Sequence, residues 1–408
     1  MIVGIDDTDS TKGMCTTYLA AKICHKLGVT DLPRLVRLNP NIPYKTRGNG
    51  AVAFKSYNKR TEEVTLSLLK KYAMMGDKRT NPGVAVLDSD EVPKPLADFY
   101  LEAVSRHVSV EEAEEVARKA NVRLFKFKNG RGIIGALAAI GFHGEKTYEL
   151  IAYRKEKNWG TQRLIDGKSI EAMDSMLYPR VFDNLSQDRK RALITPRGKD
   201  PILCGIRGIG KDDVLSAWEM VTPLEPVELV QVFETNQATD AHLRKKSVSQ
   251  VKPYDCVIVS GTIASKPRKE AGGHVFFRLC DDTGTIDCAA YKKSKTFQDT
   301  VLRLDVGDEV IVCGGIGKYP HTINLEKIEV TEVAQKWSSK PPTCCGKNMT
   351  SAGKGKGYKC KKCAKKTSQK EVKYEKISRK IIPGIYDVPA GSRRHLSKPV
   401  YLHQTKSK

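Results

Sequence analysis

The chain has 408 residues, of which 40% are hydrophobic, and its 70 Lys and Arg against 47 Asp and Glu give a formal net charge of +23. This length predicts roughly two to four domains, and the composition excludes wholesale disorder. The longest nearly unbroken apolar run, 133–142, is far shorter than the ~20 residues that span a membrane. Because Asp6, Asp7 and Asp9 stand where a signal peptide would be basic, we expect a cytoplasmic protein with no membrane partner.

The first predicted elements are a short apolar strand at 1–5 and an amphipathic helix at 16–27, separated by an acidic cluster. Carboxylates at a strand end suit Mg²⁺, which prefers oxygen ligands and is commonly shared with phosphate. Three aspartates within four residues repel one another without a cation, so we expect Asp6, Asp7 and Asp9 to bind Mg²⁺. The alternative is a cluster that only caps the helix. Thr16 opens that helix, where free N–H groups attract an anion.

Two glycine-containing loops follow, within an alternating pattern of helices and strands that runs to residue 127. Basic side chains next to backbone N–H groups freed by glycine can hold phosphates. An ordinary turn with basic residues is the alternative for the first loop. The candidate ATP-binding residues are Lys45, Arg47, Gly48 and Gly50 in the first loop and Gly130, Arg131 and Gly132 in the second.

Residues 147–223 alternate between strand and helix signals typical of a small α+β unit, and 226–333 are rich in predicted strands. A strand, a tight Asp-Asp-Thr-Gly hairpin and a second strand at 276–291 favour a five-stranded OB barrel, which binds single-stranded nucleic acid through aromatic and basic side chains. Phe276, Arg278, Tyr291 and Lys292 are the candidate contacts, although alternation must place some of them in the core.

Four of the eleven cysteines, Cys344, Cys345, Cys360 and Cys363, form two pairs separated by a Gly- and Lys-rich segment. Four thiolates can close a tetrahedral structural Zn²⁺ site, so this spacing predicts a zinc ribbon. The first pair is adjacent rather than CxxC, which makes Cys344 the least secure ligand. The other seven cysteines read as buried residues in a reducing compartment.

The charge excess is concentrated in 336–408, with 20 Lys and Arg against 3 Asp and Glu. Neutralising phosphates releases condensed counterions, so this segment favours a nucleic-acid partner over a merely solvated tail. An enzyme that uses ATP on nucleic acid explains the whole set of features. A haloacid-dehalogenase-like phosphatase, suggested by Asp7-Thr8-Asp9-Ser10-Thr11, lacks an acidic pair in the same domain. A non-catalytic RNA-binding protein leaves the first 220 residues unexplained.

The ordered set GIDDTDSTKGMCTTYLA, NPNIPYKTRGNGA, GRGIIGALAAIG, TYELIAYR, DPILCGIRG, FETNQATDAHL and SRRHLSKP closely resembles the archaeal tRNA(Ile) 2-agmatinylcytidine synthetases. The resemblance implies ATP-dependent attachment of agmatine to C2 of the wobble cytidine of a CAU-anticodon isoleucine tRNA, through a phosphorylated cytidine and with conversion of ATP to AMP and pyrophosphate. The modified tRNA would read AUA. No protein partner is evident.

The same resemblance implies a multidomain α+β chain: a kinase-like domain at 1–132, a ferredoxin-like domain at 133–224, an OB-fold at 225–335, a zinc ribbon at 336–368 and a basic tail at 369–408. It implies that Thr16 is autophosphorylated, with Thr17 beside it a nearly equal chemical candidate, and that Asp6, Asp7 and Asp9 are catalytic through Mg²⁺. Asp200 is a candidate for agmatine. The remaining candidate tRNA contacts are Asn236, Asp240, His242, Arg393, Arg394 and His395.

Overall fold

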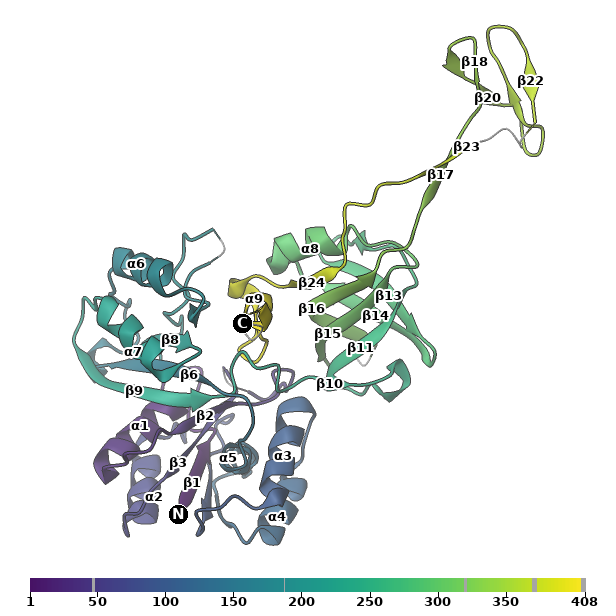
Figure 1. Cartoon of the computed structure of the whole chain (residues 1–408). Coiled ribbons are helices and arrows are strands. Elements are labelled where there is room, and N and C mark those ends of the chain that lie inside the picture. Colours follow the sequence, from purple (N-terminus) through teal and green to yellow (C-terminus); the bar gives the residue numbers. More distant parts are fainter. Residues whose placement is uncertain (46–47, 187, 319–320, 369–372, 405–408) are drawn as a thin grey trace.

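The computed structural model describes residues 1–45, 48–186, 188–318, 321–368 and 373–404. Figure 1 shows two α/β units at the N-terminal end, a barrel beside them and a small ribbon held away from the body on a stalk. Arg47 lies outside the described residues. No helix among the described ranges is long and apolar enough to cross a membrane.

The first unit is an antiparallel sheet with helices on both faces (Figure 1). Alternate residues of its strands point to opposite faces, so Val3 and Ile5 pack beneath α1 and α2, while Ile2 packs with α3, α4 and α5. The strand order is β5-β4-β1-β3-β2. Its elements are β1 (Ile2–Asp6), α1 (Thr16–Leu27), β2 (Arg34–Arg37), β3 (Gly50–Lys55), α2 (Thr61–Tyr72), β4 (Gly83–Leu87), α3 (Lys94–Ser105), α4 (Val110–Lys119), β5 (Arg123–Lys126) and α5 (Gly132–Ile140).

The second unit has the order strand, helix, strand, strand, helix, strand, and its sheet order is β9-β6-β8-β7. Strand β9 also pairs in parallel with β2, at Arg34 with Glu234 and Leu35 with Thr235. The two units therefore share one continuous nine-stranded sheet. The elements are β6 (Thr147–Arg154), the 3₁₀ turn η1 (Glu156–Asn158), α6 (Gly167–Leu177), β7 (Val181–Phe182), β8 (Ile202–Gly208), α7 (Lys211–Met220) and β9 (Val227–Thr235).

Two of the expected domain boundaries fall inside the units that the structure shows. Residues 133–140 are most of α5, whose side chains are buried against the first sheet, so the first unit extends past residue 132. Strand β9 completes the second sheet, so that unit extends past residue 224. Residues 133–140 and strand β9 are amphipathic or apolar. The sequence alone does not show which sheet each of them packs against or joins.

The barrel closes through the order β11-β15-β16-β14-β13, with β13 pairing back to β11, and a helix precedes β15. This is the OB-fold that the sequence predicts. Its core is built from alternate strand residues such as Val257, Phe277 and Val312. The elements are β10 (Arg244–Lys245), η2 (Val248–Gln250), β11 (Cys256–Ile263), β12 (Arg268–Lys269), β13 (Val275–Asp281), β14 (Gly284–Ala290), η3 (Lys292–Ser294), α8 (Lys295–Val301), β15 (Glu309–Ile316) and β16 (Thr322–Glu332).

Beyond the barrel, β17 (Trp337–Lys340) and β23 (Lys373–Lys376) form a two-stranded stalk that carries the ribbon (Figure 1). The described part of the expected basic tail is folded rather than loose. Strand β24 (Gly384–Asp387) adds to the barrel beside β16, and α9 (Val400–Gln404) ends the described chain between the barrel and the two α/β units. The ribbon strands are β18 (Thr343–Cys344), β19 (Lys347–Asn348), β20 (Thr350–Ser351), β21 (Tyr358–Lys359) and β22 (Lys366–Thr367), and η5 (Ala390–Ser392) follows β24.

Candidate active site

A cavity of about 730 Å³ opens where the first and second units meet. Its size is in the range of small-molecule sites, which are usually concave with a few convergent polar groups. The cavity brings together candidate residues that are far apart in the sequence: Asp6, Asp7, Asp9, Thr16, Lys45, Gly48, Gly50, Arg131, Asp200 and His395 all line it.

The carboxylates lie at the end of β1, as the sequence predicts. Asp7 adopts the left-handed region with φ +55° and pairs with Arg131, whose Nη2 lies 3.3 Å from Oδ2. Burial, followed by the charge of Asp7, raises the pKa of Asp6 well above its usual value. Burial likewise raises the pKa of Asp7 to about 6, against the opposing effect of Arg131. At this end of the cavity the acids are therefore buried from solvent, and too little positive charge surrounds them to favour their ionised forms.

The N-terminus of α1 faces the same space. Cys15 is the N-cap residue, and its side chain makes no capping hydrogen bond to the helix. The first turn contains no acidic residue, so its N–H groups keep their attraction for an anion. Thr16, buried at this turn, accepts a hydrogen bond from Thr8 Oγ1 at 3.0 Å. Its hydroxyl is therefore held at the wall of the cavity that the aspartates also line.

The two glycine loops have different roles in the structure. Gly48 and Gly50 line the cavity together with Lys45, whose pKa is lowered by burial and by the charge of Arg394. In the second loop only Arg131 and the neighbouring Asn129 line the cavity; the Gly132 N–H donates to Asn81 O at 2.9 Å and is not available to a phosphate. The expectation of a backbone cradle at Gly130 and Gly132 is wrong in this respect. Gly132 lets α5 pack closely against Gly83 and Asn81, and the Gly130 N–H, in a left-handed turn with φ +76°, donates to Phe127 O at 3.0 Å.

The opposite wall contains residues that sequence reasoning missed. Glu149 on β6 is buried between two guanidiniums, with Arg37 Nη2 at 3.3 Å and Arg207 Nε at 3.7 Å. Glu149 also accepts a hydrogen bond from Gln237 Nε2 at 2.5 Å. All but Gln237 line the cavity. The motifs TYELIAYR, DPILCGIRG and FETNQATDAHL contain three of these four residues, and an acid at the third position of an otherwise apolar strand was the available signal.

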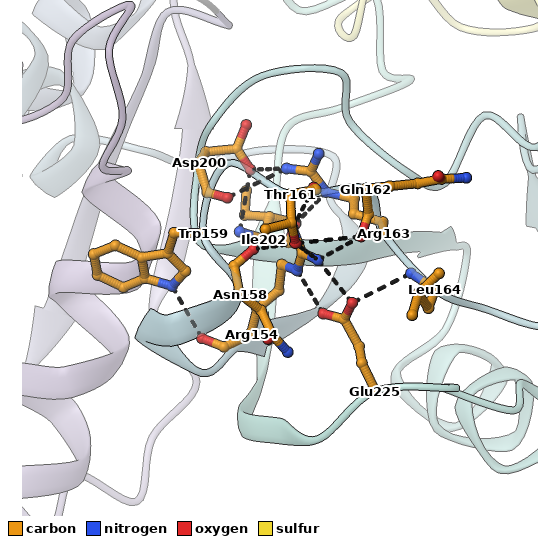
Figure 2. A network of polar contacts seen from close by, with 10 residues as sticks. All are labelled: Arg154, Asn158, Trp159, Thr161, Gln162, Arg163, Leu164, Asp200, Ile202 and Glu225. Carbon is orange, nitrogen blue, oxygen red and sulfur yellow. Dashed lines mark hydrogen bonds and ion pairs between the residues drawn. The ribbon is translucent and has the colours of Figure 1, made fainter.

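Asp200 lies at the edge of the cavity and ends a buried polar network (Figure 2). Its Oδ1 accepts from Arg163 Nη2 at 2.8 Å and from the Ile202 N–H at 3.1 Å. Behind it, fully buried Arg154 pairs with Glu225 and donates to the Thr161 and Gln162 carbonyls at 2.9 and 2.8 Å. The network fixes the loop that carries Arg163, so the Asp200 carboxylate has a defined orientation; its role toward agmatine stays a prediction.

The candidate tRNA contacts divide into surface residues and buried residues. Arg278 and Lys292 are exposed on the barrel and Phe276 is half-buried, with Arg278 and Phe276 on the outer face of β13. Asn236 and His242 are fully buried. Asn236 exchanges hydrogen bonds with the Arg37 backbone at 2.8 and 2.9 Å, and His242 Nε2 lies 3.0 Å from Glu326. These two side chains cannot touch RNA from where they lie, so the expectation of direct contact is wrong for them.

Asp240, Arg393, Arg394 and His395 instead join residues 236–243 to residues 392–399. The Ala238 and Asp240 N–H groups donate to the carbonyls of His395 and Leu396 at 2.8 and 2.9 Å. Asp240 accepts from Lys327 Nζ at 2.5 Å and from the Lys398 N–H at 2.7 Å. Hydrogen bonds and charges from His403 and Lys327 overcome burial and lower the pKa of Asp240 to about 2.

The two arginines of this segment also form their ion pairs and hydrogen bonds within the protein. Arg393 pairs with Asp183 of the second unit and with Asp387 of β24, the latter at 2.9 Å, and its side chain is only 5% exposed. Arg394 donates to Asn41 at 2.5 Å and lies 3.3 Å from Glu326. Residues 393–398 therefore connect the barrel, the second unit and the cavity. Direct tRNA contact is not available to Arg393 in this arrangement.

The four clustered cysteines converge on one point. Their Sγ atoms all lie within 4.8 Å of one another, with 3.9 Å between Cys344 and Cys345 and 3.5 Å between Cys344 and Cys363. A tetrahedral site with Zn–S bonds of ~2.3 Å places its sulfurs roughly 3.8 Å apart, so the geometry fits zinc. Cys345 has φ +49°, the left-handed turn that lets two adjacent cysteines reach one metal. Among the described residues the three aspartates do not converge in this way.

Comparison with known proteins gives matches along the whole chain. The matching family models are the TiaS TCKD domain at 2–63, the TiaS FLD domain at 130–242, an OB-fold nucleic acid binding domain at 257–333 and the TiaS C-terminal zinc ribbon domain at 341–381. The tRNA(Ile2) 2-agmatinylcytidine synthetase TiaS of Pyrococcus horikoshii is 46% identical, with 100% of this chain and 98% of that protein covered.

Two solved structures are similar over 98% of this chain and 96% of theirs. One, described as the TiaS-tRNA(Ile2)-ATP complex, has a TM-score of 0.91 at 41% identity. The other, described as the TiaS-tRNA(Ile2)-AMPCPP-agmatine complex, has a TM-score of 0.87 at 38% identity. Identity at this level over nearly the full length shows common family membership as well as a common fold.

Proposed function

The chain belongs to the TiaS family of tRNA(Ile2) 2-agmatinylcytidine synthetases, and we propose that it attaches agmatine to C2 of the wobble cytidine of the CAU-anticodon isoleucine tRNA at the expense of ATP. The observation that carries the proposal is the single cavity in which the acids of β1, the start of α1 and the polar wall of the second unit face one another. A non-catalytic RNA-binding protein has no use for such a site.

The cavity suits the first half of this chemistry, in which the poor leaving group at C2 must be activated. Cleavage of ATP by water to AMP and pyrophosphate would supply the activation: one phosphoryl group of the pyrophosphate passes to the C2 oxygen, and the other leaves as phosphate. Lys45 and Arg131 line the cavity as phosphate ligands, and the N–H groups that open α1 add to them. Thr16 lies in this turn, so its hydroxyl is placed to accept a phosphoryl group.

Mg²⁺ is part of the proposal, held by Asp7 and Asp9 together with Asp6 and with phosphate oxygens as further ligands. The donor set is all oxygen, and a bound cation would favour the charged forms of Asp6 and Asp7, which burial disfavours. When bound, the ion neutralises charge on the phosphates as phosphoryl moves. The DxDxT-like sequence does not favour a phosphatase, because Arg131 occupies Asp7 Oδ2.

The second half of the reaction needs agmatine beside the activated cytidine. Asp200 lines the cavity with a fixed orientation and is our candidate for the guanidinium, a charge that a carboxylate recognises. The amine nitrogen forms the C2–N bond, the C2–O bond breaks, and phosphate leaves. The target base lies in an anticodon loop, so it can enter the cavity at modest unstacking cost.

The remaining parts serve the tRNA. We infer that the first unit is the kinase-like domain and that the βαββαβ unit with order β9-β6-β8-β7 is the ferredoxin-like domain. Structural zinc would be held by Cys344, Cys345, Cys360 and Cys363 and would fold the ribbon. Phe276, Arg278 and Lys292 on the barrel, together with the basic ribbon, would contact the tRNA, and the site of action would be the cytoplasm.

The test mixes the purified full-length protein with ATP, Mg²⁺, radiolabelled agmatine and one of two tRNAs. Label should enter the CAU-anticodon isoleucine tRNA and not elongator methionine tRNA, which shares the anticodon. ATP consumption without labelled tRNA would favour a phosphatase or kinase. Tight binding of tRNA with no ATP consumption would favour a non-catalytic binder and would contradict the proposal.

A further inference from the structure

His395 presents its imidazole to the cavity through a chain of contacts that fixes its hydrogens. Glu149, which lies between Arg37 and Arg207, accepts from Gln237 Nε2 at 2.5 Å. An ion-paired carboxylate can only accept, so this contact decides which end of the Gln237 amide is nitrogen. The other end, Oε1, therefore faces His395 Nδ1 at 2.9 Å.

An amide oxygen can only accept, so His395 Nδ1 must carry the proton. In the neutral imidazole Nε2 is then a hydrogen-bond acceptor. Burial, followed by the charges of Arg37 and Arg207, lowers the pKa of His395 well below its usual value, so the ring stays neutral. In the described part of the chain Nε2 has no hydrogen-bond partner.

Nε2 faces the first glycine loop across the cavity. A Cβ at Gly48 would lie 2.6 Å from Arg37 Nη1, which it would crowd, and 3.9 Å from His395 Nε2, an ordinary contact distance. Gly48 is thus next to the acceptor, and both residues line the cavity. Two buried side chains, Glu149 and Gln237, hold this acceptor in place.

We propose that His395 is a specificity-determining residue: its Nε2 accepts a hydrogen bond from the exocyclic amino group of the target cytidine. The inference rests on the proposed function. Uridine, which presents a carbonyl oxygen at that position, would face this lone pair and be rejected. Gln237 and Glu149 act through His395 and are positioning residues.

Agmatine is the other substrate with an amino group, but the surroundings disfavour it here. Arg37 and Arg207 flank Glu149, and after burial their charges disfavour a positive charge at His395. Agmatine carries two positive charges at neutral pH and is repelled, whereas the cytosine amino group is neutral. The carboxylate of Asp200 offers agmatine a better partner within the same cavity.

The test is a double-mutant-type cycle, in which the His395 imidazole and the amino group of the target base are removed separately and together. Agmatine incorporation (kcat/KM for tRNA) is measured on isoleucine tRNA with cytidine at the wobble position and on the same tRNA with 2-pyrimidinone there, which replaces the amino group by hydrogen. Wild type should lose roughly 10- to 100-fold on the pyrimidinone tRNA. His395→Phe should lose a similar factor on cytidine tRNA and little more on pyrimidinone tRNA.

Two further variants separate recognition from folding. His395→Gln can place an amide oxygen in the cavity and should restore part of the preference for cytidine. Gln237→Leu frees the imidazole tautomer and should reduce that preference while zinc content and tRNA affinity stay at wild-type values. His25→Phe, at an exposed histidine on α1, is the matched control and should change neither tRNA's rate.

The outcomes distinguish the inference from the function on which it rests. If the loss from His395→Phe and the loss from 2-pyrimidinone multiply when both changes are combined, His395 does not contact the amino group. That result would overturn the inference. The same holds if His395→Phe raises only the KM for agmatine and keeps the full preference for cytidine, which would assign the acceptor to agmatine. Absence of transfer by wild type to cytidine tRNA would instead reject the proposed function, and the inference with it.

Discussion

Ionisable groups around the cavity are shifted toward their neutral forms. Burial raises the pKa of Asp6 and Asp7 and lowers that of Lys45 and His395. Such shifts arise where side chains lose water without gaining enough opposite charge. In the proposed reaction the triphosphate and its cation supply that charge for Asp7 and Lys45. His395, by contrast, stays neutral because burial and the charges of Arg37 and Arg207 disfavour its charged form.

The Asp7 shift has a measurable effect on stability. Its pKa is about 6 in the folded chain against 3.8 as an ordinary value, so the folded state holds the proton more tightly. The stabilisation that this gives is present below pH 4 and is lost as pH rises through 6. Asp7→Asn should therefore raise the free energy of unfolding at pH 7.5 without ligands, by up to about 3 kcal/mol.

The measurement is thermal or denaturant unfolding with EDTA present, at pH 7.5 and at pH 4.5. The gain from Asp7→Asn should shrink at the lower pH, where the wild-type carboxyl is largely protonated. A variant that is destabilised equally at both pH values would show that the ion pair with Arg131 outweighs the burial of the charge.

For single residues, the sequence could predict only which positions close together in the chain would lie at one site. Asp6, Asp7, Asp9 and Thr16 are close together in the chain and their site could be predicted. Contacts between distant residues could not, since Gln237 is 88 residues from Glu149 and 158 from His395. For that reason Asn236 and His242 could be recognised as part of a motif but not as buried.

At the scale of elements, α5 lies unusually close to the strand that carries the acids. A Cβ at Gly135 would lie 1.9 Å from Asp6 Oδ2, and one at Gly4 would lie 2.0 Å from the Ala136 carbonyl oxygen. In the spacing Gly130-x-Gly132-x-x-Gly135, Gly132 and Gly135 therefore serve helix–strand packing, whereas Gly130 forms a left-handed turn before the helix. Sequence letters alone cannot separate this use of glycine from phosphate binding, because both need a backbone that something approaches closely.

Gly135→Ala should push the Asp6 carboxylate or α5 out of place. We expect a loss of agmatine transfer of at least tenfold and a lower melting temperature, because the clash is with a fixed, buried group. Gly167→Ala is the control, since a Cβ there meets nothing within 4 Å. Unchanged transfer by Gly135→Ala would mean that the position of Asp6 does not matter to the reaction.

At the scale of the whole molecule, the C-terminal segment joins parts that are far apart in the chain. It leaves the ribbon, adds β24 to the barrel and ends beside the cavity with His395 (Figure 1). The barrel and the ribbon were predictable because each is a local repeat of strands or cysteines. The nine-stranded sheet and the docked C-terminus were not, because they depend on pairings such as that of β2 with β9.

Two deletions should therefore have different effects. Replacing 341–368 by a short linker removes eight Lys and no acidic residue, so tRNA affinity should fall and its salt dependence should flatten, while transfer at saturating tRNA persists. Truncation after residue 389 removes His395 together with the Lys398 N–H and the His403 side chain that contact Asp240, so transfer should be lost. An unchanged salt slope after ribbon deletion would show that the ribbon is not a phosphate-binding surface.

The central claim is that the acids at the end of β1 act on ATP in the cavity where agmatine meets tRNA. The most direct measurement compares wild type with Asp7→Asn for ATP cleavage, agmatine transfer and tRNA affinity in the same preparation. We predict that Asp7→Asn loses both cleavage and transfer and binds tRNA as wild type does. Transfer that continues in the variant, or tRNA binding that is lost with cleavage intact, would contradict the claim.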